Sequence, residues 1–167
     1  DLALREPEVE EGGKTITIPL KENVKWHDGT PFKADDVIFT IATIQDPAYK
    51  SPIRANWVGV EVEKTGSQKV RFRLSQPYAA FPDRLTLKII PAHIWENINP
   101  ENFALSFYNL QPVGTGPYKL KNITQDKSGR VKQIALERFR QYHGDTPFIP
   151  SLVFTFSDKE GQATTTF

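Results

Sequence analysis

One short stretch of the sequence holds the side chains that could do acid–base chemistry. It reads KWHDGTPFKADDVIFTI over residues 25–41 and contains His27, Asp28, Asp35 and Asp36. A histidine beside carboxylates can transfer protons at neutral pH, which raises the hypothesis of a hydrolase subdomain that uses Asp35, Asp36 or His27. Adjacent residues on a helix, however, project about 100° apart, and neighbours across a turn rarely converge on one atom. We therefore expect structural roles here and keep the hydrolase as an alternative.

The rest of the chain offers few other groups for catalysis. Cysteine is absent, so the sequence has no disulfide, thiolate metal site or cysteine nucleophile. His27, His93 and His143 are widely separated, and their spacing matches no metal-binding motif. The Gly-Thr-Gly at 114–116 lacks the further glycine and the lysine of a phosphate-binding loop, so we expect a tight backbone bend there. We predict no catalytic residue, no metal and no cofactor.

Composition narrows the class of protein further. The 167 residues include 21 Lys and Arg against 20 Asp and Glu, a net charge of +1. That balance gives no reason to expect nucleic acid or an anionic membrane as a partner. No apolar run approaches the roughly 18 residues that a membrane helix needs. Methionine is absent even at position 1, and from this we expect a processed or excised segment without its targeting signal.

The elements that must position the opening stretch can be predicted from local signals. Asp-Gly-Thr-Pro at 28–31 is typical of a turn. From Ala34 the apolar residues recur every three or four positions, which predicts a helix of about 10 to 12 residues with one buried stripe. Asp35 and Asp36 fall in its first turn, where the helix dipole favours negative charge. Asp46-Pro47 should end the helix.

The remaining pattern is rich in strands. We predict three hairpins, over residues 1–20 with a turn at Gly12-Gly13, over 58–77, and over 116–139 with a turn at 126–129. Further expectations are a strand at 85–90, a helical turn after Pro91, a long loop or short helix at 97–112, and a final strand at 151–158. Pro19 indicates an edge strand or a strand end. The predicted fold class is α+β, a strand-rich mixed domain with one clear helix.

Aromatic residues gather in or beside the predicted loops. Rings flanked by Pro, Asn or Ser can line a wet cleft, because an aromatic side chain buries a large area and Tyr keeps a polar tip. We select Tyr49, Trp57 and Tyr108 as candidate ligand-binding residues.

Three blocks of the sequence together resemble one protein family. ITIPLKENVKWHDGTPFKADDVIFTI, PVGTGPYKLKN and IALERFRQYHGDTPFIPSLVFTF occur in the order found in the family 5 extracellular solute-binding proteins, the oligopeptide, dipeptide and nickel receptors of ABC importers. Four positions depart from the family pattern. Lys33 stands where the family usually has a capping Thr, Phe139-Arg140 replaces Asn-Pro, and His143 replaces Trp.

The resemblance implies a fold, a function and a location. It implies a fragment of the first lobe of a two-lobed, class II periplasmic-binding-protein-like fold. Residues 21–133 would be mainly the small extra subdomain, and 1–20 and 134–167 would be strands at or joining the larger subdomain. The intact protein would capture a solute, most simply a peptide, for an ABC permease outside the cytoplasm, and would meet the membrane only through a lipid anchor outside this fragment. Nickel chelates, sugars and opines remain open as solutes.

The resemblance also implies a role for the opening stretch. Strand, turn and helix would be tied together by an unreactive structural motif, whose residues here are Trp26, Asp28, Gly29, Asp36, Gly114 and Gly116. The alternatives from other classes are the hydrolase subdomain and a free-standing β-rich adhesion module.

Overall fold

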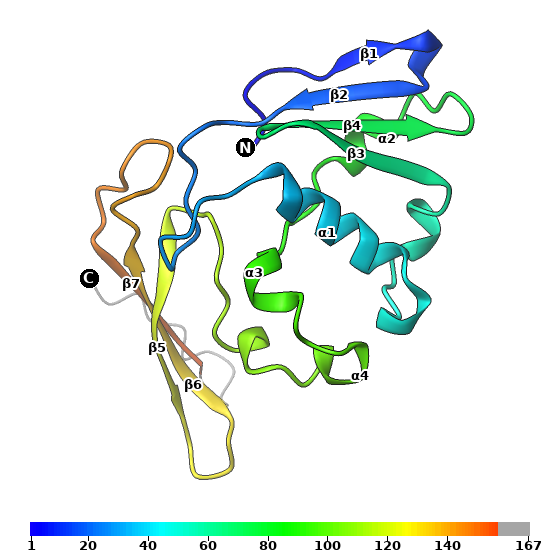
Figure 1. Ribbon diagram of the computed structural model, residues 1–167. Helices are drawn as coiled ribbons and strands as arrows, with labels where there is room; N and C mark the ends of the chain where they lie inside the picture. The colour runs from blue at the N-terminus through cyan, green and yellow to red at the C-terminus, as the bar shows by residue number, and fades with distance from the viewer. Residues whose placement is uncertain (157–167) are drawn as a thin grey trace.

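The computed structural model of the protein describes residues 1–156, and two separate antiparallel sheets organise them (Figure 1). The first sheet has the strand order β1-β2-β4-β3. Its strands are β1 (Glu8–Glu10), β2 (Thr15–Pro19), β3 (Val60–Gly66) and β4 (Lys69–Leu74). The hairpins predicted for 1–20 and 58–77 are therefore confirmed, although β3 begins two residues later than expected. Pro19 is the last residue of an internal strand, so the strand-end interpretation is the correct one.

A single long helix covers the first sheet. Helix α1 (Ala34–Gln45) begins and ends as predicted, and it contacts β3 and β4. Its buried stripe consists of Val37, Ile41 and Ile44, whereas Ile38 is only partly buried. Together with the inward residues of the sheet and the aromatic residues Trp26, Phe32, Trp57, Phe72 and Phe81, this stripe forms the hydrophobic core.

Short helical segments connect the larger elements. They are α2 (Phe81–Arg84), α3 (Ala92–Trp95) and α4 (Pro100–Phe103), together with the 3-10 turns η1 (Glu11–Gly13), η2 (Pro47–Tyr49), η3 (Arg54–Asn56) and η4 (Phe107–Asn109). The helical turn expected after Pro91 is α3. None of the helices in the described part of the chain is long and apolar enough to span a membrane.

The strand predicted at 85–90 is wrong. Leu85, Leu87 and Ile89 alternate because they pack against the core from one side, without a partner strand. The backbone N–H of Ile90 donates to the Thr40 hydroxyl of α1 at 3.1 Å and not to a strand carbonyl. One-sided burial of an irregular segment gives the same two-residue period as a strand.

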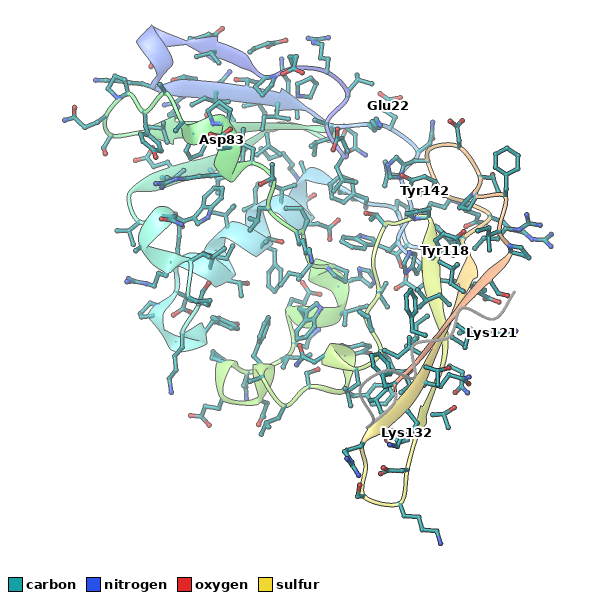
Figure 2. All side chains as sticks on the ribbon, turned by 180° about the vertical axis from the view of Figure 1, so that it is seen from behind. Glu22, Asp83, Tyr118, Lys121, Lys132 and Tyr142 are labelled. Atoms are coloured by element: carbon teal, nitrogen blue, oxygen red, sulfur yellow. The ribbon has the colours of Figure 1, made fainter. Side chains whose placement is uncertain are left out.

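The second sheet has the order β5-β6-β7. It stands beside the first unit, which consists of the first sheet and α1 (Figure 1). Its strands are β5 (Tyr118–Gln125), β6 (Val131–Arg138) and β7 (Ser151–Thr155), as predicted except that the expected end at 157–158 lies outside the described residues. Figure 2 shows the labelled Tyr118, Lys121 and Lys132 on this sheet.

One face of the second sheet is apolar and is only partly covered by the described residues. The strand register places Leu120, Leu136 and Leu152 in one row and Ile123, Ile134 and Phe154 in the next. None of these six side chains is buried, and Phe154 is 51% exposed. An apolar sheet face is stable only when another layer packs against it, so this sheet has the surface of an incomplete layer.

Backbone pairing groups the described strands into two sheets, and the subdomain ranges 1–20, 21–133 and 134–167 stay a prediction. Strands β1 and β2, within residues 1–20, share a sheet with β3 and β4, and Ile16 and Ile18 lie in the same core as α1. Strand β5, which lies within the range 21–133, pairs instead with β6. Backbone pairing therefore separates the described residues near 114–117, just before β5.

Packing of α1 gives a direct test of this core. We expect Ile41→Ala to lower the free energy of unfolding by about 2–5 kcal/mol, because Ile41 is 1% exposed and its loss leaves a cavity. Ile38→Ala on the same helix is the matched control and should cost clearly less, since its side chain is partly exposed. Urea denaturation followed by Trp fluorescence measures both, and equal losses would contradict this packing.

Candidate functional site

The Asp-Gly-Thr-Pro stretch forms the turn that was predicted for it. The N–H of Gly29 donates to the carbonyl of Trp26 at 2.8 Å, and the N–H of Thr30 donates to Oδ1 of Asp28 at 2.9 Å. Gly29 has φ of 91°, a left-handed conformation that a residue without Cβ adopts at no steric cost. The chain thus reverses on itself and brings Phe32 against Trp26, with ring centroids 5.9 Å apart.

The carboxylate of Asp36 joins three separate segments. Its Oδ2 accepts the N–H of Lys33 at 2.8 Å and the indole N–H of Trp26 at 3.3 Å, and its Oδ1 accepts the N–H of Ala92 at 2.9 Å. The bond from Lys33 is the carboxylate half of a capping box. It forms here even though the Lys33 side chain has no acceptor to make the other half. Asp36 therefore holds the start of α1, the strand-end tryptophan and the start of α3 together.

His27 connects the first unit to the entry of the second sheet. Its backbone N–H donates to the carbonyl of Gly114 at 2.8 Å, Nδ1 accepts the N–H of Gly114 at 3.2 Å, and Nε2 donates to the carbonyl of Gly116 at 3.0 Å. Only the neutral ring protonated on Nε2 makes both side-chain bonds. A Cβ on Gly114 would lie 3.4 Å from Cε1 of His27, which is an ordinary van der Waals contact.

The same histidine has a shifted pKa. Burial lowers the pKa of His27, and the nearby charge of Lys119 acts in the same direction. The Gly116 carbonyl and the Asp28 carboxylate oppose the shift without reversing it. The neutral form required by the Gly114 bond is therefore the favoured one.

Asp28 pairs with a histidine from another element. Its Oδ2 lies 2.7 Å from Nε2 of His93 on α3. Burial raises the pKa of the Asp28 carboxyl, but hydrogen bonds from His93 and Thr30 outweigh burial and hold the pKa below its usual value. This contact ties the turn to α3 beside the Asp36 bond, and no local pattern in the sequence indicates it.

The acidic residues and His27 do not form a catalytic group. Asp35 is exposed and pairs with Lys64 at 2.6 Å, whereas Asp36 is buried and its oxygens accept three N–H groups. His27 bonds to backbone groups of Gly114 and Gly116. Within residues 1–156, no three His, Asp or Glu side chains are arranged to hold a metal ion.

Two of the three candidate ligand residues lie in one aromatic cluster. Tyr49 contacts Phe103 at a centroid distance of 5.0 Å, Phe103 contacts Trp95 at 4.4 Å, and Trp95 contacts Tyr108 at 6.1 Å. Tyr49 is partly exposed, and Tyr108 is 37% exposed. Sequence reasoning did not identify Trp95 and Phe103 as the centre of this cluster, because nothing in the local pattern links α4 to η2.

Trp57 lies elsewhere. It is 2% exposed and packs between Phe72 and Phe81, with centroid distances of 6.2 and 5.7 Å. Trp57 also lines a hollow of about 730 Å³. Other core side chains, residues 1–7 and several residues between 82 and 89 line the same hollow. Trp57 is thus a core residue in this structure, and it is not brought together with Tyr49 and Tyr108.

Two positions that depart from the family pattern pack against other aromatic rings. Phe139 is buried and its ring packs edge-on against His27 at 5.1 Å. The ring of His143 packs against Tyr142, and both of its nitrogens are buried without a hydrogen-bond partner among the described residues. Burial, helped by the charge of Lys21, lowers the pKa of His143.

Known proteins match this chain over almost its whole length. The family described as bacterial extracellular solute-binding proteins, family 5 Middle, matches residues 1–167. The chain belongs to this family. Its mixed α+β fold is also that of solved family structures, a substrate-binding protein CtaP from Listeria monocytogenes (TM-score 0.86, 33% identity, 95% of this chain) and the oligopeptide-binding protein AppA from Bacillus subtilis in complex with a nonapeptide (TM-score 0.82, 27% identity, 93% of this chain).

Family members in these comparisons are much longer than this chain. The dipeptide-binding protein of Escherichia coli is 32% identical over 170 residues, which cover 90% of this chain and 31% of that protein. The matches to CtaP and AppA cover 32% and 30% of those chains. The chain thus spans about a third of the length of these solute-binding proteins.

The Asp36 junction generates a paired prediction. Asp36→Asn should lower the free energy of unfolding by about 1–3 kcal/mol, because an amide replaces one acceptor oxygen by an N–H₂ group and leaves a buried N–H unpaired. Asp35→Asn is the matched control and should cost no more than about 1 kcal/mol, since its ion pair with Lys64 is exposed. Urea denaturation at constant pH measures both variants, and equal effects would contradict the junction.

Proposed function

We propose that this chain is part of a non-enzymatic receptor that captures peptides outside the cytoplasm for an ABC importer. The observation that carries the proposal is the match of the whole chain to the family 5 solute-binding proteins. The E. coli relative is named for dipeptides, and the AppA structure holds a nonapeptide. These two names favour a peptide over a nickel chelate, sugar or opine as the solute.

A structural role for the acid and histidine side chains supports the absence of catalysis. A general base needs an available lone pair within reach of a substrate proton. The oxygens of Asp36 and the Nδ1 of His27 instead accept N–H groups from the protein itself. The hydrolase alternative therefore has no convergent residues to use.

The partly covered apolar face of the second sheet supports a longer receptor. The apolar rows of β5, β6 and β7 need a covering layer, and the relatives have about three times the length of this chain. We propose that the remaining polypeptide packs on this face and builds the larger part of a two-lobed receptor. A lipid anchor and the contact with the permease would belong to that remaining part.

Solute capture in such a receptor would follow from closure of two lobes around the peptide. A ligand that contacts both lobes stabilises the closed form by its differential affinity for that form. Backbone hydrogen bonds and aromatic pockets give affinity with little dependence on peptide sequence. We propose that the cluster of Tyr49, Trp95, Phe103 and Tyr108 supplies an aromatic wall for the solute and that Trp57 serves the core.

Titration calorimetry of the complete receptor tests both levels of this proposal. The receptor should bind a nonapeptide or a dipeptide, and mass spectrometry should recover the peptide uncleaved. Tyr49→Ala and Tyr108→Ala should each weaken binding at least about fivefold, the loss typical of a truncated interface residue. Tyr78→Ala, an exposed tyrosine that stacks with Arg84 outside the cluster, is the matched control and should leave affinity unchanged.

The outcomes separate the two claims. A receptor that binds no peptide, or that cleaves it, would overturn the proposed function. Normal binding by both tyrosine variants would leave solute capture in place and would overturn the assignment of the aromatic wall.

A further inference from the structure

His27 links the unit built from the first sheet and α1 to the segment that leads into the second sheet. Residues 25–31 belong to the unit built from the first sheet and α1, whereas 114–117 lead directly into β5 of the second sheet (Figure 1). Three hydrogen bonds join His27 to Gly114 and Gly116 across this boundary.

The second sheet also contacts the His27 ring directly. Phe139, which follows the last residue of β6, packs edge-on against the imidazole, and the N–H of Phe139 donates to the carbonyl of Pro117 at 2.7 Å. One imidazole therefore contacts both the entry to β5 and the exit from β6. It is thus a point of contact between the second sheet and the unit built from the first sheet and α1.

The bond pattern depends on the protonation state of this ring. Nδ1 is an acceptor for the Gly114 N–H, and an added proton would place two donors against each other at 3.2 Å. The Nε2 bond to Gly116 is compatible with either state, since Nε2 carries a proton in both. Protonation would thus break one side of the junction and leave the other as a pivot.

We propose that neutral His27 is a pH-sensitive latch that fixes the orientation of the two sheets and that protonation releases it. If the proposed function holds, acid would loosen the lobe that contributes the aromatic wall. The inference about the latch concerns this chain alone and needs no solute.

The charges around the latch set the direction of its response to pH. Asp28 favours the charged form of the His27 ring, and Lys119 disfavours it. His27 lines a hollow of about 510 Å³, and the charged residues Glu137, Arg138 and Arg140 line it as well. Burial is the largest influence and lowers the pKa of His27 below the usual value of about 6.5. The latch is therefore fully formed above about pH 6.5 and is lost as the pH falls through the lowered pKa.

The experiment combines a distance measurement with an exchange measurement on the 167-residue chain. Because the chain has no cysteine, Thr65→Cys on β3 and Thr124→Cys on β5 place two spin labels on exposed strand positions. Between about pH 7.5 and pH 5, the distance distribution should broaden or shift as NMR of the imidazole nitrogens reports protonation of His27. Amide exchange of Gly114, corrected for intrinsic pH dependence, should rise roughly fivefold.

Two variants separate the latch from other titrating groups. His27→Gln keeps a donor and an acceptor but cannot titrate, so it should remove the pH response of the label distance. His93→Gln, at the neighbouring histidine that pairs with Asp28, is the matched control and should keep the response.

Three results would overturn the latch. They are a His27 ring that stays neutral down to about pH 5, an unchanged label distance while that ring titrates, and an undiminished response in His27→Gln. None of them bears on peptide capture, because no peptide is present. A receptor that fails to bind peptide would equally leave the latch untouched.

Discussion

The carboxylate of Asp36 is almost fully withdrawn from solvent, with the residue 5% exposed, and three N–H groups from separate segments converge on it. A buried carboxylate is costly unless its oxygens are hydrogen-bonded, so the three donors and the acceptor require one another. Lys33, Trp26 and Ala92 cannot move apart without leaving this charge unpaired. Asp36 thus connects the strand end, the start of α1 and the start of α3 through one carboxylate.

The residues best suited to acid–base chemistry have structural partners in this arrangement. Their side chains hydrogen-bond to backbone groups of other segments and to side chains of distant elements, as in the pair formed by Asp28 and His93. In the proposed receptor, whose parts would move as bodies around a solute, the second sheet would be attached to the first unit at His27. Membership of the family 5 solute-binding proteins agrees with such a scaffold.

Local signals in the sequence were enough for some elements and not for others. The helix of residues 34–45 could be predicted to the residue, because its apolar period and the Asp46-Pro47 stop are both encoded locally. The false strand at 85–90 arose because packing from one side imitates strand periodicity. Two of the three partners of Asp36 lie 10 and 56 residues away, so no spacing rule indicates them. Trp57 resembled a loop aromatic in the sequence, and only the fold shows that Phe72 and Phe81 enclose it.

Native-state hydrogen exchange is the most direct measurement of the Asp36 constraint. In Asp36→Ala, which removes both acceptor oxygens, the Lys33 and Ala92 amides should lose protection by roughly tenfold or more relative to Phe72 of the central strand β4, which serves as an internal reference. Because Ala92 reaches Asp36 only through the folded chain, loss at both amides would mean that one carboxylate holds the two helix starts together. Unchanged protection of Ala92 relative to Phe72 would contradict that account.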